Sequence, residues 1–210
     1  MGRYLGSSCK QCRREGIKLM LKGFRCETAK CPVEKKQRNL APGMHGWRRP
    51  RPGAYLVRLR EKQKVKRYYG LLNRQFMRFF YEAERQKGNT GEKLLQLLER
   101  RFDNVIYKLN FASSRKAARQ MISHGHIYIN GRKVDIPSYI TNVGDKITVK
   151  NTEKSRKIIK QQLDSNPNFT TQSWLELDRQ EPRATVVDLP TREDVQIPIE
   201  EQLVIEFCSR

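Results

Sequence analysis

The fold is decided by residues 88–134, which read GNTGEKLLQLLERRFDNVIYKLNFASSRKAARQMISHGHIYINGRKV. Over 92–109 the apolar residues recur at helical spacing, and Asn89 precedes them as a candidate helix cap with Glu92 as its capping-box partner. The pattern therefore predicts one amphipathic helix over 92–109. Its buried face should consist of Leu94, Leu95, Leu97, Leu98, Phe102, Val105 and Ile106.

A second helix and a hairpin follow in the same stretch. We expect the helix to be capped by Ser113 and to end at Gly125, with Ala118, Met121 and Ile122 facing inward. Residues 126–134 alternate around an Asn130-Gly131 pair, which predicts a β-hairpin with a tight turn. Ile127 and Ile129 should point inward, and His126 and Tyr128 outward.

The flanking segments extend this pattern. Two further helices are predicted over 55–69 and 71–87, separated by Gly70, and a short strand over Lys146–Val149. In the second of these helices Phe76, Phe79, Phe80 and Ala83 mark a core face. Helices on a small antiparallel sheet define an α+β fold class.

The charge of the chain is extreme and uneven. Its formal net charge is +21, and residues 1–70 hold 20 Lys or Arg against 4 Asp or Glu, whereas residues 161–210 hold 4 against 10. Solubility alone requires a net charge with a magnitude of only about 2–8 in a small domain. A polyanion such as nucleic acid is therefore the expected partner, and an anionic membrane surface is the weaker alternative because no amphipathic anchor accompanies the basic runs.

The chain contains no apolar run long enough to cross a membrane, and its first residues do not read as a signal peptide. We therefore expect a cytoplasmic protein without a membrane partner. Disulfides are uncommon in that reducing compartment.

Four of the five cysteines lie within 23 residues, at Cys9, Cys12, Cys26 and Cys31. The spacing, two residues then thirteen then four, is close to the paired-knuckle pattern that holds one tetrahedral zinc ion. Surrounding cations would lower the pKa values of the thiols. We expect one structural Zn²⁺, with an iron–sulfur cluster or free or disulfide-bonded cysteines as the alternatives. Cys208 is interpreted as a small buried hydrophobe.

Basic and aromatic residues form the candidate RNA-binding set. Residues 39–55 are broken by Pro and Gly, which suits irregular RNA backbone but also a plain linker. The helix at 55–69 has cations at i, i+4 spacing. The helix that ends at Gly125 and the hairpin after it should carry a convex cationic face. The set comprises His45, Trp47, Arg48, Arg49, Arg51, Arg58, Lys62, Lys66, Arg115, Lys116, Arg119, His124, Arg132 and Lys133.

The acidic end of the chain should bind protein instead. The segment 195–210 combines an apolar run, Leu203 to Phe207, with Glu200, Glu201 and Glu206. We expect the apolar side chains to fold back on the helical region near Phe76, and the three carboxylates to face a basic protein neighbour.

Residues 59–76, 88–134 and the ending EEQLVIEFCSR resemble the S-four family of bacterial small-subunit ribosomal proteins over nearly the whole chain. The helix–helix–hairpin part alone occurs in many RNA-modifying enzymes, but the basic helical pair and the closing segment are those of the ribosomal family. Some members lack the cysteines, and this chain resembles the zinc-bearing ones. Residues 152–194 carry no distinctive match.

The resemblance implies a structural protein of the small ribosomal subunit, not an enzyme. It implies a primary binder of 16S ribosomal RNA at a junction in the five-prime domain, which nucleates subunit assembly. It also implies ribosomal proteins S-five and S-three as neighbours, near the messenger RNA path, a role in decoding accuracy, and no small-molecule substrate.

Other classes fit the sequence less well. A modifying enzyme would need a catalytic domain for which 210 residues leave no room, and the motifs of a zinc deaminase are absent. A zinc-containing RNA- or DNA-binding regulator outside the ribosome remains the alternative. We expect a cysteine segment at 1–45, a helical domain at 46–90 closed by 195–210, and an RNA-binding module within 91–194.

Overall fold

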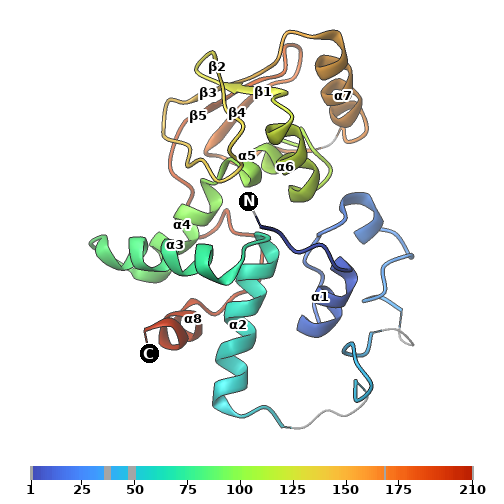
Figure 1. The fold of residues 1–210 in the computed structure, drawn as a ribbon. Coiled ribbons are helices and arrows are strands. Elements are labelled where there is room, and N and C mark those ends of the chain that lie inside the picture. The colour runs from blue at the N-terminus through green and yellow to red at the C-terminus, as the bar shows by residue number, and fades with distance from the viewer. Residues whose placement is uncertain (1, 36–38, 47–50, 168, 210) are drawn as a thin grey trace. The chain divides into compact units, whose positions relative to one another are not determined.

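The computed structural model describes residues 2–35, 39–46, 51–167 and 169–209. It divides into two compact units, Met1–Leu94 with Gln196–Arg210 and Leu95–Val195. The predicted α+β class is confirmed, because helices accompany an antiparallel sheet (Figure 1). Within the described ranges, no helix combines the length and the apolar character that crossing a membrane requires.

The first unit is helical. α2 (Ala54–Tyr68) and α3 (Asn73–Arg85) are joined at Gly70, whose φ of +67° lies in the left-handed region that favours glycine. Both helices match the predicted ones to within a few residues. The predicted core face of α3 is confirmed, since Phe76, Phe79, Phe80 and Ala83 are buried.

The N-terminal segment of this unit holds α1 (Ser8–Glu15) and a short 3-10 helix, η1 (Gly23–Cys26). The buried carboxylate of Glu15 accepts a hydrogen bond from Arg67 of α2 and lies 3.6 Å from Nη1 of Arg60. Burial raises the pKa of Glu15, and the two arginines oppose that rise. This ion pair ties α1 to α2.

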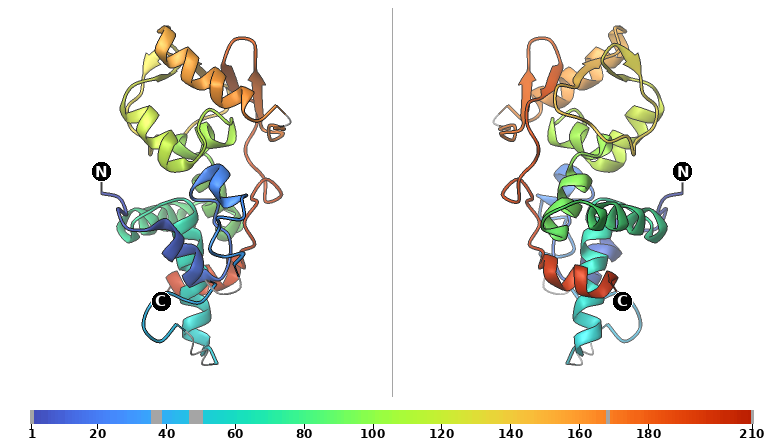
Figure 2. Two further views of the ribbon diagram at one scale, coloured as in Figure 1. Left: turned by 90° about the vertical axis from the view of Figure 1, so that its right-hand side faces the viewer. Right: turned by 90° about the vertical axis from the view of Figure 1, so that its left-hand side faces the viewer.

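The C-terminal helix α8 (Glu201–Cys208) packs beside α2, as Figures 1 and 2 show. The Phe207 ring lies 5.4 Å from the Tyr55 ring, and Nζ of Lys62 lies 4.9 Å from the centre of Phe207 and 5.9 Å from that of Phe76. The expected return of the chain end to the helical region is therefore found, with α2 as the main partner.

The prediction of a single helix over 92–109 is wrong, because this region forms two helices, α4 (Thr90–Glu99) and α5 (Phe102–Lys108). Arg101 is extended and forms an isolated β-bridge with Ile140. The N–H groups of Phe102 and Asp103 donate to carbonyls of residues 137 and 139 instead of continuing the helix. The predicted cap is confirmed at the start of α4, where Asn89 Oδ1 accepts from the N–H of Gly91 at 3.0 Å.

The next elements follow the sequence pattern closely. α6 spans Arg115–Ser123, and its cap is Ser114, whose hydroxyl accepts from Ala117, so the predicted cap at Ser113 is wrong by one residue. The hairpin is confirmed as β1 (Ile127–Ile129) and β2 (Arg132–Lys133). Its turn residues have φ of +50° and +77°, the conformation that an Asn-Gly pair adopts at low strain.

The sheet of the second unit is larger than the sequence predicted. The expected strand β3 (Lys146–Val149) is confirmed, and β4 (Leu175–Asp178) and β5 (Arg183–Val186) add to it in the antiparallel order β2-β1-β3-β5-β4. Between β3 and β4 lies helix α7 (Glu153–Asp164). Residues 152–194 are thus part of the core architecture.

The core of the second unit is built around aromatic and branched side chains from α5, α6, α7 and four of the five strands. Trp174 is 1% exposed and its indole N–H donates to Gln172 Oε1 at 3.0 Å. It shares one apolar cluster with Phe102 and Ile147, both fully buried. The region with the least distinctive sequence therefore supplies the largest core side chain.

Replacing Trp174 by Ala should lower the free energy of unfolding of this unit by about 3–5 kcal/mol, because a large buried side chain leaves a cavity. Urea denaturation followed by circular dichroism measures the change. Val187→Ala is the control, since Val187 is exposed beyond the end of β5, and its midpoint should not move. An equal effect of both variants would contradict this assignment of the core.

Candidate nucleic-acid interface

Four of the predicted RNA-binding residues are exposed on the second unit. Lys116 lies in the first turn of α6 and His124 just after its end, and Arg132 and Lys133 form β2. The Lys133 side chain passes over Gly125, where an added Cβ would stand 2.6 Å from its Cε, so the hairpin lies beside the C-terminal end of α6. We call these four residues the α6–hairpin face.

The expectation that Arg115 and Arg119 belong to this exposed face is wrong. Arg115 is 6% exposed, and its Nε donates to Asn104 Oδ1 at 2.8 Å while its guanidinium lies 4.5 Å from the Tyr107 ring centre. The Arg119 side chain is 12% exposed and its Nε lies 3.3 Å from Asp103 Oδ2. Both arginines are directed into the unit, because α5 offers polar partners on the side that α6 packs against.

These contacts belong to a buried polar network at the α4–α5 break. Arg101, which is fully buried, donates from Nε and Nη2 to the two carboxylate oxygens of Asp103 at 3.1 and 2.8 Å. Asn104 donates to the backbone oxygen and the carboxylate of Glu99 at 2.9 and 2.6 Å. A bidentate arginine–carboxylate pair fixes orientation as well as charge, so the network holds α4, α5 and α6 in one arrangement.

The predicted basic stripe on α2 is largely used within the first unit. Arg58 Nε donates to Glu206 Oε2 at 2.6 Å, and Lys62 is buried against the two rings described above. Lys66 is half-buried, and burial together with the neighbouring cations Lys62 and Arg67 lowers its pKa. The expectation of an open cationic stripe on α2 is therefore wrong, because α8 packs on this helix.

The loop that precedes α2 is described only in part. His45 and Arg51 are exposed, whereas Trp47, Arg48 and Arg49 lie outside the described residues.

Of the three acidic residues predicted to face a protein neighbour, Glu200 is exposed and Glu201 and Glu206 are partly buried.

A second group of exposed cations, which the sequence reasoning missed, lies on α7. Lys154, Arg156, Lys157 and Lys160 are all exposed on this helix. Three of them, Arg156, Lys157 and Lys160, line one hollow along α7 together with Glu153 and Asp164. The run EKSRKIIKQQLD, with Thr152 before it, has the apolar spacing and charge that could have revealed an amphipathic basic helix.

The four clustered cysteines surround one small cavity of about 10 Å³ in the first unit. All are free thiols, and the N–H of Lys22 donates to Sγ of Cys26 at 3.3 Å. Among the residues that the structure describes, no group of three or more Cys, His, Asp or Glu is arranged to hold a metal ion. The predicted zinc site is therefore not confirmed.

The electrostatics of the cysteine cluster differ from the expectation. Burial raises the pKa of Cys12 and of Cys26, and the nearby thiols add to the rise, so the prediction that surrounding cations lower these pKa values is wrong for both. Backbone N–H groups that face the two sulfur atoms oppose the shift. The neutral thiol is therefore favoured at these two positions.

Exposed cations lie on α6, on the hairpin and on α7. A basic surface of this kind is typical of nucleic-acid-binding proteins, and the fold therefore belongs to that class. Residues 3–99 match the family described as "Ribosomal protein S4/S9 N-terminal domain", and residues 100–147 match the "S4 domain".

Full-length relatives carry the same signal. The chain is 54% identical over 212 residues to the small ribosomal subunit protein uS4 of Pelobacter propionicus. It is 52% identical over 210 residues to that of Thermoanaerobacter pseudethanolicus and 50% identical to that of Halothermothrix orenii. In each case all of both chains is covered. The chain belongs to the uS4 family of bacterial small ribosomal subunit proteins.

Replacing Asp103 by Asn should lower the free energy of unfolding of the second unit by about 3–5 kcal/mol, since it removes the carboxylate that pairs with the buried Arg101. Arg119→Ala should have a smaller effect, because Arg101 keeps its partner. Chemical denaturation measures both, with Lys157→Gln at an exposed position of α7 as the control that leaves the midpoint unchanged. Equal stability of Asp103→Asn and the parent protein would show that the network does not hold the helices together.

Proposed function

We propose that this protein is a structural, non-enzymatic component of the small ribosomal subunit that binds 16S ribosomal RNA. The observation that carries the proposal is full-length identity of about half to proteins named small ribosomal subunit protein uS4. The exposed cations of the α6–hairpin face and of α7 supply the chemistry, because cations that replace counterions on phosphate give affinity for structured RNA. A cytoplasmic location follows from this role.

The finer assignments extend the same proposal. We propose that the RNA target is the helix junction in the five-prime domain and that binding there nucleates assembly. The protein neighbours would be ribosomal proteins S-five and S-three, near the messenger RNA path, and contact with them would support decoding accuracy. Glu200, which is exposed, and the partly buried Glu201 are the carboxylates that a basic neighbour could reach.

The salt dependence of binding tests the RNA surface. Replacing Lys116, Arg132 and Lys133 together by Gln should reduce the slope of log affinity against log salt by roughly 0.7–0.9 for each phosphate that is no longer neutralised. The probe is a five-prime domain fragment of 16S ribosomal RNA in a filter-binding titration. Arg183→Gln is the control, because its guanidinium is already paired with Glu181 at 2.8 Å. An unchanged slope in the triple variant would show that these cations are only solvated charge.

The alternative is a regulator outside the ribosome that binds RNA or DNA. Two measurements separate it from the ribosomal role: sedimentation of the protein with small subunits from a lysate, and competition between folded ribosomal RNA and duplex DNA at equal salt. Cosedimentation and preference for the RNA support the ribosomal role. Absence from the subunits, or preference for the duplex, would overturn it.

We also propose that Cys9, Cys12, Cys26 and Cys31 bind one structural Zn²⁺. What supports this is the spacing of the four cysteines and the cavity that they share, with a backbone N–H on Cys26 that opposes part of the effect of burial on its pKa. Four sulfur ligands leave no open coordination position, so the ion would hold the segment around α1 and η1 in one shape and take no part in catalysis.

Elemental analysis of the purified protein should find one zinc per chain. Cys26→Ser should lose the metal and loosen residues 1–45 while the second unit, with its own core, stays folded. Cys208→Ser, which changes the buried cysteine of α8, is the control and should keep the metal. Iron with visible absorbance, or no metal in the parent protein, would contradict the proposal.

A further inference from the structure

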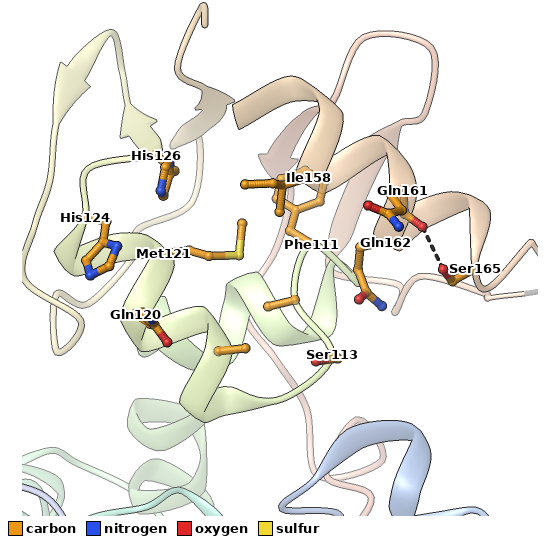
Figure 3. Close-up of a pocket in the computed structure, with 12 residues that line it drawn as sticks. Phe111, Ser113, Gln120, Met121, His124, His126, Ile158, Gln161, Gln162 and Ser165 are labelled. Carbon is orange, nitrogen blue, oxygen red and sulfur yellow. Dashed lines mark hydrogen bonds between the residues drawn. The ribbon is translucent and has the colours of Figure 1, made fainter. Parts of the chain in front are cut away.

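The second unit contains a groove between α6 and α7, shown in Figure 3, with a volume of about 450 Å³. That volume is within the range of about 300–1,000 Å³ that is usual for small-molecule sites. The groove is lined by residues of α6 and α7, by the loop before α6 and by His126 just before β1. Among the residues assigned above to RNA binding, His124 lies at this groove.

Part of the groove's lining is apolar and part is polar. Ile158 on α7 is 47% exposed. Met121 on α6 projects into the same groove in Figure 3. The buried ring of Phe111 lies behind them. An exposed isoleucine opposite a methionine gives a flat, adaptable wall of the kind on which a planar group packs.

The rim of the groove is polar, and none of its described lining residues is a carboxylate. Gln120, Gln161 and Gln162 offer amides that both donate and accept, as the edges of nucleobases require. His126 is oriented by a hydrogen bond between its Nδ1 and the hydroxyl of Ser155 at 2.9 Å. Burial, with His124 and Lys150 nearby, lowers the pKa of His126, so the ring is neutral at pH 7 and can stack or hydrogen-bond.

The groove adjoins the cations of α7. Gln161 and Ser165 line it and also line the neighbouring hollow that contains Arg156, Lys157 and Lys160 together with Glu153 and Asp164. On the other side it is lined by His124, a member of the α6–hairpin face. A slot next to exposed cations is complementary to a base whose flanking phosphates lie outside the slot.

We propose that the α6–α7 groove holds one unstacked base of the bound RNA, with its neighbouring phosphates on the cations of α7. This inference rests on the proposed RNA-binding function. It assigns to α7, and so to the region with the least distinctive sequence, a direct part in recognition. The base packs between Ile158 and Met121, and the glutamine amides meet its edge.

The test uses the full-length protein and a five-prime domain fragment of 16S ribosomal RNA. Ile158→Ala should weaken binding by about 5- to 10-fold, toward the lower limit for removal of one base-stacking interaction, without changing the salt slope. Ile136→Ala is the matched control, because Ile136 is a similarly exposed isoleucine (55%) on a loop that does not line the groove. Gln161→Ala, at an exposed position, is a second variant should Ile158→Ala fail to fold.

Chemical probing of the RNA gives the specific readout. The parent protein and Ile136→Ala should protect an unpaired base that becomes reactive in the complex with Ile158→Ala or Gln161→Ala, while backbone protections stay the same. Unchanged affinity and unchanged base reactivity in both groove variants would overturn the base site and leave the proposed function intact. Variants that protect every base but fail to enter small subunits would assign the groove to a protein neighbour and also overturn it. Failure of the parent protein to bind the fragment would overturn both proposals.

Discussion

The ion pair between Arg101 and Asp103 is the constraint on which the second unit depends. A fully buried guanidinium is tolerated only when a carboxylate meets it in good geometry, and here both oxygens of Asp103 do so. The pair sits where α4 gives way to α5, and the same carboxylate receives Arg119 from α6. One buried aspartate therefore links the break between α4 and α5 to α6.

This arrangement separates two roles that look identical in the sequence. Arg115 and Lys116 are neighbours on α6, yet Arg115 is buried against Asn104 and Tyr107 while Lys116 is exposed. The first unit repeats the division, since Lys62 lies over aromatic rings and Arg58 is paired with the C-terminal helix. A planar guanidinium suits stacking and bidentate pairing, as Arg115 and Arg101 show, but Lys108 is buried in the second unit as well. Total charge thus overstates the surface that faces RNA.

What the sequence could predict follows from how local each signal is. The helices α2 and α3, the Asn130-Gly131 hairpin and the strand at Lys146–Val149 depend on periodicity and turn chemistry within a few residues, and they were found. The break at Arg101 could not be found, because its cause is a bridge to Ile140, far along the chain. β4 and β5 are four residues each, too short to carry a strong pattern alone, and they depend on pairing of β5 with β4 and with β3. Burial of Arg115 depends on a packing partner on another helix.

The late strands and α7 also explain why the basic module needs more than its helices and hairpin. β1 and β2 are only three and two residues long, and a lone hairpin of that length is marginal in water. β3 joins them to β5, and Trp174 closes the core under the sheet. The same region carries α7, whose inner residue Ile159 is buried while its cations remain outside. Stability and charge are thus supplied by one segment, so a surface that binds RNA here must be read from the whole unit and not from the S4 domain match at 100–147 alone.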